Sequence, residues 1–164
     1  NPCPCGNYGS RITPCRCTAQ QIQRYRNRIS GPMLDRIDIH VEMGEVGYND
    51  IAGRSCGEPS SAIRARVNAA RAIQTRRYAG MGILFNAQLT NRMMNQYCVL
   101  TSDAEALMKK AFAALKLSAR AYTRLLKVSR TIADLAGSEQ IKAEHIAEAI
   151  QYRSLESKYW GEIK

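Results

Sequence analysis

The sequence predicts a mainly α-helical protein in which the end of an α/β domain precedes a helical bundle. Apolar residues recur at helical spacing from Ser60 onward. Only residues 37–43 alternate apolar and polar side chains with the period of a strand. Residues 1–18 show neither period and are rich in cysteine, proline and glycine, which predicts a loop. We expect three parts: 1–46 as the α/β end with its cysteine-rich loop, 47–59 as a linker, and 60–164 as a helical domain.

The α/β end is expected to contain one helix and one strand. Residues 19–28 favour a helix by propensity, and Gly31 and Pro32 follow it as breakers. In the segment 37–43, Ile37 and the apolar residues at every second position after it would share one face of the strand. The glycines and polar residues that follow predict the linker.

The helical domain is expected to contain several amphipathic segments. The best defined begins at Ser118, a favourable N-cap, and ends at Gly137, a favourable terminator. In the helix from Ser60 to Tyr78, Ile63, Val67, Ala70 and Ile73 or Gln74 share one face. The other segments are 86–96, a helix starting at Thr101 or Ser102 and ending at Leu115, and 143–152.

The chain is strongly basic, with 24 Lys and Arg against 14 Asp and Glu and a net charge of +10. Arginines cluster at 24, 26 and 28 and again at 64, 66, 71, 76 and 77. Such a surface attracts nucleic acid, nucleotide phosphates or an acidic partner, although solvated arginine faces are equally compatible with the pattern. No apolar run is long enough to span a membrane and no export signal opens the chain, so we expect a cytoplasmic protein.

Four of the six cysteines form two closely spaced pairs. Cys3 and Cys5 are separated by nine residues from Cys15 and Cys17. Four thiolates on one loop can enclose a tetrahedral Zn²⁺, and they leave no open position for a catalytic water. The sequence therefore predicts a structural zinc site, with free thiols or disulfides as the alternatives.

Arg36 follows a proline-containing turn, Gly31-Pro32, and directly precedes the expected strand. A guanidinium held at the edge of a strand can bind a phosphate in bidentate fashion. An ordinary surface ion pair with Asp35 or Asp38 is the alternative interpretation. Neither histidine has a neighbouring pattern of partners, so His40 and His145 are expected to be surface or cap residues.

Several blocks in order along nearly the whole chain resemble the magnesium-chelatase-like AAA+ ATPases of the ComM/YifB type: NPCPCG, CRCT, QIQRYRNRISGPMLDRIDIHVE, SSAIRARVNAARAIQTRR, SARAYTRLLKVSRTIADLAG and HIAEAIQYR. The resemblance implies that the bundle is the helical lid of such an ATPase, of the magnesium-chelatase C-terminal type. It also implies that Asn1 is the sensor-1 residue, Arg36 the arginine finger and Arg120 the sensor-2 arginine. For the whole protein it implies a hexameric ring that binds ATP and Mg²⁺ and acts on DNA during recombination of incoming DNA.

The sequence contains no G-x-x-x-x-G-K-[ST] loop, and it opens on Asn1 rather than methionine. We therefore expect a C-terminal fragment that does not hydrolyse ATP alone. Two other functions remain open: a zinc-stabilised nucleic-acid-binding module, and a subunit of a true magnesium chelatase. The cysteine loop argues against the second.

Overall fold

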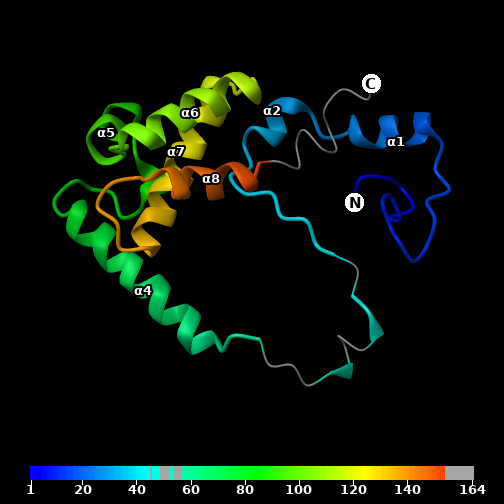
Figure 1. Cartoon of the computed structure of the whole chain (residues 1–164), viewed down its shortest axis with the longest axis horizontal. Coiled ribbons are helices and arrows are strands. Elements are labelled where there is room, and N and C mark those ends of the chain that lie inside the picture. Colours follow the sequence, from blue (N-terminus) through cyan, green and yellow to red (C-terminus); the bar gives the residue numbers. More distant parts are fainter. Residues whose placement is uncertain (45, 49–51, 54–56, 154–164) are drawn as a thin grey trace.

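The computed structural model describes residues 1–44, 46–48, 52–53 and 57–153, and it is mainly α-helical (Figure 1). This confirms the predicted fold class. In the described part of the chain no helix is long and apolar enough to cross a membrane. The elements in chain order are α1 (Ala19–Arg26), α2 (Gly31–Leu34), α4 (Ser60–Arg77), the 3₁₀ helix η1 (Asn86–Gln88), α5 (Asn91–Tyr97), α6 (Ser102–Ala114), α7 (Ala119–Leu135) and α8 (Ala143–Gln151).

Helix α7 is the centre of the helical bundle, which we define as residues 60–153. It packs against α8, α4 and η1, and α8 packs in turn against α6. Burial of apolar side chains between these helices removes them from water and is the main source of stability for such a core. The core includes Tyr78, Leu89, Met94, Met108, Leu125, Leu126, Ile141 and Ile146.

Both predicted ends of α7 are confirmed. The side chain of Ser118 accepts a hydrogen bond from the backbone N–H of Ala121 at 3.1 Å, which satisfies one of the free N–H groups of the first turn. At the other end Gly137 has a φ of 66°, a conformation that glycine adopts without steric cost. The backbone N–H of Ser138 then bonds to the carbonyl of Ala133 at 2.8 Å, as in a Schellman motif.

The strand predicted over residues 37–43 is wrong. The structure assigns no strand within the described ranges, where Leu100 and Ile141 form an isolated parallel bridge. A strand forms only when its backbone pairs with a neighbouring strand, and the described residues supply none. The segment instead bonds to the end of α8: the N–H of His40 donates to the carbonyl of Tyr152 at 2.8 Å.

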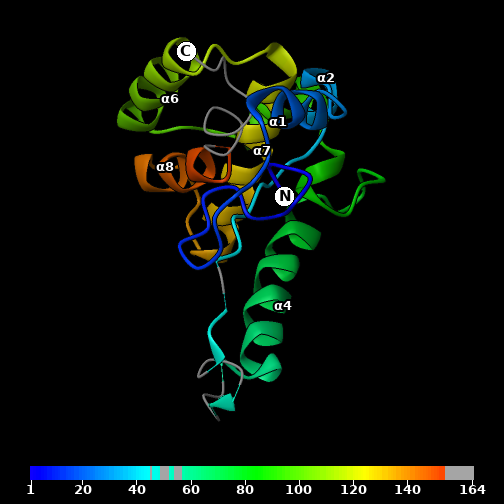
Figure 2. The ribbon, with the colours of Figure 1, turned by 90° about the vertical axis from the view of Figure 1, so that its right-hand side faces the viewer.

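Helix α4 has the predicted length, but its expected buried face is only partly buried. Ala70 and Gln74 lie in the core, whereas Ile63 and Val67 are 43% and 42% exposed. Figure 2 shows the reason, because the N-terminal half of α4 extends away from α7 and α8. Helical periodicity identifies a face, and the packing partner decides how much of that face is covered.

Two further predictions change in detail. The expected helix 86–96 is divided into η1 and α5, because the side chain of Thr90 caps α5 and begins a new helix there. The predicted linker 47–59 falls partly on residues 49–51 and 54–56, and the tail of the predicted domain on 154–164; these residues lie outside the described ones. The division into domains therefore stays a prediction.

Candidate functional site

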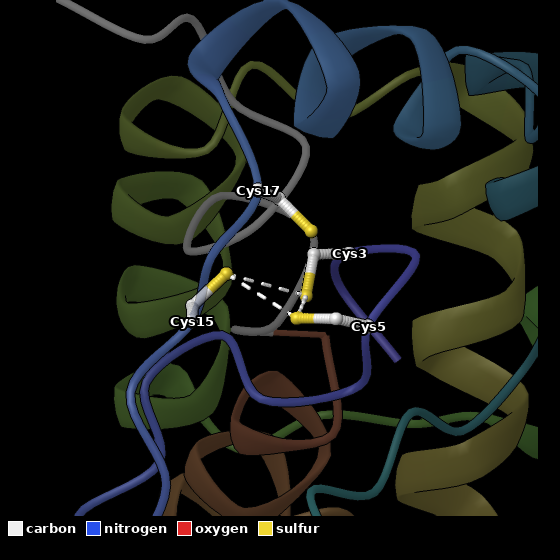
Figure 3. A group of neighbouring side chains, drawn as sticks. All are labelled: Cys3, Cys5, Cys15 and Cys17. Atoms are coloured by element: carbon white, nitrogen blue, oxygen red, sulfur yellow. Dashed lines mark hydrogen bonds between the residues drawn. The ribbon is translucent and has the colours of Figure 1, made fainter.

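The four paired cysteines come together, although they lie on two separate stretches of the loop (Figure 3). The Sγ atoms of Cys3 and Cys5 are 3.4 Å apart, those of Cys5 and Cys15 are 3.6 Å apart, and those of Cys3 and Cys15 are 3.7 Å apart. All four sulfurs, including that of Cys17, lie within 4.8 Å of one another. The loop thus presents four soft ligands toward one point.

These distances fit a metal ion. With Zn–S bonds of about 2.3 Å in a tetrahedron, the sulfurs are expected about 3.8 Å apart. The fold of the loop also suits such a cluster: Gly6 has a φ of 82°, and its N–H donates to the carbonyl of Cys3 at 3.2 Å. This tight turn brings the first pair of cysteines back toward the second. Four cysteines in this arrangement can hold a metal ion.

The thiols of the cluster do not share one ionisation behaviour. Hydrogen bonds from the backbone of Asn7 and Arg16 lower the pKa of Cys5 to about 6. At Cys17 a backbone hydrogen bond from Cys5 lowers the pKa, but the neighbouring sulfurs and burial together raise it to about 12. Thiolates bind metals and repel one another, so a cation among these four sulfurs would relieve the repulsion that opposes ionisation of the last thiols.

An arginine on the last turn of α1 reaches back to the cysteine loop. Arg26 is only 5% exposed, and its Nε donates to the carbonyl of Pro2 at 3.1 Å. Its guanidinium also lies over the ring of Tyr8, 4.5 Å from the ring centre. The sequence placed Arg26 among the surface arginines, and the structure shows that it is buried.

The segment around Arg36 docks onto the first turns of α7 and the end of α8. Asp35 accepts hydrogen bonds from the hydroxyl of Ser118 at 2.7 Å and from Arg153 at 3.2 Å. Asp38 pairs with Arg124 of α7. Both acidic neighbours of Arg36 are therefore occupied by other groups. Within the described ranges Arg36 makes no ion pair, and its side chain is exposed.

Arg120 lies on the first turn of α7, two residues from Ser118, and is exposed. It lines a groove of about 440 Å³ between α7, the end of α8 and the segment at Asp38 and Ile39. Arg124 and Lys127, one and two turns further along α7, line the same groove. Helix α7 thus contributes three cations and several apolar side chains to the groove, and Asp38 and Glu148 line it as well.

The structure brings some of the predicted site residues together. The segments that carry Arg36 and Arg120 meet at the Asp35–Ser118 hydrogen bond, which joins residues 83 positions apart. Asn1 lies with the cysteine loop: a Cβ atom built on Gly6 would be 3.7 Å from its Nδ2. Asn1 is exposed, as Arg36 and Arg120 are.

A second polar cluster was not predicted from the sequence. Asp134 of α7 is 2% exposed; it accepts hydrogen bonds from Arg77 at 2.9 Å, from Asn86 at 2.8 Å and from Arg130 at 3.2 Å. Arg130 is completely buried and also donates to the carbonyl of Glu139 at 2.7 Å. The spacing of Arg130 and Asp134, one helical turn apart on the apolar face of α7, is the signal that sequence reasoning overlooked. We assign this cluster to the packing of α4, η1 and α7.

Comparison with known proteins places the two parts of the chain in related families. Residues 57–153 match the family described as magnesium chelatase, subunit ChlI C-terminal, and residues 1–51 match magnesium chelatase, subunit ChlI. The uncharacterized protein YifB of Salmonella typhimurium is 40% identical over 157 residues, which cover 95% of this chain and 30% of YifB.

Two other relatives extend this comparison. The competence protein ComM of Haemophilus influenzae is 42% identical over 156 residues, which cover 94% of this chain and 30% of ComM. An uncharacterized protein of Mycobacterium tuberculosis is 31% identical over 153 residues, or 93% of this chain and 30% of that protein. The chain thus spans about 30% of the length of these relatives. Because the C-terminal family match covers more than half of the chain, the protein belongs to the magnesium-chelatase-like family of YifB and ComM.

Proposed function

We propose that this chain supplies nucleotide-contacting arginines to an ATP-hydrolysing ring formed by the whole protein, with ATP and Mg²⁺ as its ligands. Arg36 acts as the arginine finger at the ATP of an adjacent subunit. Arg120 is the sensor-2 arginine of the helical lid, and Asn1 is the sensor-1 residue that orients the attacking water. The ring is a hexamer that acts on DNA.

The observation that carries this proposal is the docking of the Arg36 segment on α7. Asp35 and Asp38 are held by Ser118, Arg153 and Arg124, so the backbone on both sides of Arg36 is tied to the bundle. The guanidinium itself points to no carboxylate of the described residues and is exposed. A fixed backbone with a solvated arginine suits contact with a phosphate that arrives from another molecule, because the cation needs no rearrangement to bind.

Arg120 supports the same proposal from the other side of the contact. It stands on the first turn of α7, where the helix dipole disfavours a positive charge. The groove beside it already contains Arg124 and Lys127. Arg124 is paired with Asp38, but Arg120 and Lys127 have no carboxylate partner among the described residues, so an anion between them would meet favourable charges. Phosphate oxygens of a nucleotide are anions of suitable size and charge.

Zinc is the metal that we propose for the cysteine loop. Soft thiolate ligands favour Zn²⁺ over Mg²⁺, which prefers oxygen. Four protein ligands make the site structural. Bound zinc would supply only a fixed tetrahedral anchor, and the nucleotide chemistry would belong to the residues of the ring.

The arginine finger is tested by Arg36→Ala in a protein that spans the full length of the relatives. We expect the rate of ATP hydrolysis to fall about 10³-fold or more, the range found for loss of arginine fingers, while nucleotide affinity stays within a few-fold. Arg64→Ala is the matched control, because Arg64 is also exposed but lies on α4, away from the Arg36 segment. The 164-residue chain alone, which contains no G-x-x-x-x-G-K-[ST] loop, is expected to show no hydrolysis.

A mixing experiment tests whether two subunits share one nucleotide site. Arg36→Ala subunits mixed with subunits defective in their phosphate-binding loop should recover part of the activity, because each contributes what the other lacks. Equal hydrolysis rates for Arg36→Ala and Arg64→Ala would overturn the proposal. Loss of activity without recovery on mixing would overturn the assignment of Arg36 to the neighbouring site.

A further inference from the structure

Helix α1 is attached to the cysteine loop at both of its ends. At its start, Thr18 is the N-cap and immediately follows Cys17, the last of the four cysteines. Thr18 and Gln21 form a reciprocal capping box, so this end of the helix is well defined. At its other end, Arg26 bonds to Pro2, the neighbour of Cys3. The loop therefore spans the length of the helix.

The attachment at Arg26 places a charged side chain in a buried position. A buried guanidinium loses its hydration, and this cost must be recovered by hydrogen bonds or by an opposite charge. The carbonyl of Pro2 and the ring of Tyr8 are two of the groups that recover this cost. A cluster of four thiolates around one Zn²⁺ would carry a net charge of −2. One of its ligands, Cys3, directly follows Pro2 in the chain. A positive charge at Arg26 complements that cluster.

From this arrangement we propose that Arg26 is a positioning residue, which joins the metal-closed cysteine loop to α1 and thereby fixes Asn1 relative to Arg36. The proposal rests on the nucleotide roles proposed above for Asn1 and Arg36. Neither the cysteines nor Arg26 touches the nucleotide; their effect passes through the backbone of the loop and of α1.

The connection can be followed residue by residue in both directions. Toward the N-terminus, Arg26 donates to the carbonyl of Pro2, and Pro2 directly follows Asn1. Toward the C-terminus, the carbonyl of Arg26 accepts the N–H of Ile29 at 3.0 Å, and the chain turns directly into α2. Leu34 of α2 is buried, and Arg36 follows it after one residue. Only short, hydrogen-bonded steps separate the loop from both residues.

The first experiment measures the connection without using ATP hydrolysis. In the 164-residue chain with its metal bound, amide hydrogen exchange is compared between Arg26→Gln and Arg24→Gln. Arg24 lies on the same helix and is exposed, so it is the matched control. We expect faster exchange over residues 1–9 and 19–34 in Arg26→Gln alone, with exchange in the bundle and the zinc content unchanged. Equal exchange in the two variants would overturn the proposal.

The second experiment asks whether the connection matters for hydrolysis in a protein of the relatives' full length. Arg26→Gln should lower kcat on the order of 10- to 100-fold, as expected for misplaced catalytic groups, while the Kd for ATP stays unchanged. Arg26→Lys, which keeps the charge, should recover part of that loss. If Arg36→Ala abolishes hydrolysis but Arg26→Gln equals Arg24→Gln, this inference fails and the proposed function stands. If Arg36→Ala has no effect, the proposed function itself fails.

If Arg26→Gln prevents folding of the loop, both the zinc content and the protection of its amides against hydrogen exchange would fall. The conservative variant Tyr8→Leu then serves instead, because it removes the ring under the guanidinium and leaves the hydrogen bond to Pro2 in place. A smaller fall in kcat with full zinc content is expected. An unchanged kcat together with unchanged exchange would overturn the proposal.

Discussion

Two of the arginines that are buried in the described part of the chain, Arg130 and Arg26, have different surroundings. Arg130 in the helical bundle lies in an apolar core and is paired with Asp134, one turn further along the same helix. Arg26 in the N-terminal part contacts a carbonyl and an aromatic ring of a loop. Arg130 is neutralised by a carboxylate of its own helix. Arg26 keeps its contacts only while the cysteine loop is itself folded.

The bundle and the N-terminal region therefore differ in what stabilises them. The bundle contains a buried apolar core and internal ion pairs. The segment from 1 to 34 buries few large apolar side chains, chiefly Ile22 and Leu34, so its stability must come from elsewhere. A metal bound by four cysteines is the candidate source. The two regions should therefore respond differently to the same perturbations.

Removal of zinc is expected to have the largest effect, and only on the N-terminal region. Structural zinc binds with an apparent free energy of about 10–16 kcal/mol, which far exceeds what this segment can obtain from burial. After chelation, hydrogen exchange over residues 1–26 should approach that of an unfolded chain, while α7 and α8 stay protected. Elemental analysis of the reduced protein should show zinc that is lost in Cys3→Ser and retained in Cys98→Ala. Reduced protein without zinc would contradict this prediction.

Loss of the Asp134 carboxylate is expected to have the next largest effect, and only on the bundle. Asp134→Ala leaves Arg77 and Arg130 without their shared partner, and Arg130 is fully buried. Breaking a buried ion pair in this way costs about 3–5 kcal/mol. The free energy of unfolding in urea should fall by this amount, with zinc content unchanged. Asp103→Ala, at an exposed position in the first turn of α6, should cost less than about 1 kcal/mol. Similar losses in the two variants would contradict the prediction.

Sequence reasoning predicts the bundle well because its helices carry their own signals. The boundaries of α7 follow from Ser118 and Gly137, since caps act locally and need no information about the rest of the fold. The cysteine cluster is also local, since its two pairs lie close in sequence and the turn at Gly6 brings them together. The buried cluster around Asp134 was missed because charged residues in a helix are usually exposed.

The failures concern contacts between distant segments. Residues 37–43 have the period of a strand, yet the described residues offer no strand to pair with it. Ile63 and Val67 have the period of a buried face, yet they stay 43% and 42% exposed. The docking of Asp35 on Ser118, which links residues 83 positions apart, leaves no local pattern at either residue. Periodicity shows which structure a segment could form, and the segment against which it packs decides whether that structure forms.

The smallest expected effect is a pH dependence confined to the bundle. His145 is 3% exposed and its Nδ1 accepts the N–H of Lys142 at 3.0 Å, so it caps α8 as predicted but from a buried position. Burial lowers the pKa of His145, although Glu144 acts in the opposite direction. The folded protein therefore holds this imidazole neutral at pH values where the unfolded chain, with an ordinary pKa of about 6.5, already binds a proton.

The sign of the pH effect follows directly. Well above pH 6.5 the imidazole of His145 is neutral in both states, and stability is not affected. As the pH falls below about 6.5, the unfolded chain gains a proton that the folded chain does not, so stability decreases by at most about 1.4 kcal/mol per pH unit. His145→Asn keeps an acceptor for the N–H of Lys142 but cannot titrate. Urea unfolding at pH 7.5 and 5.5 should show a larger loss in the unaltered protein than in His145→Asn, because the carboxylates titrate in both. Equal losses would show that His145 is protonated in the fold, and that the end of α8 is more open to water than its burial indicates.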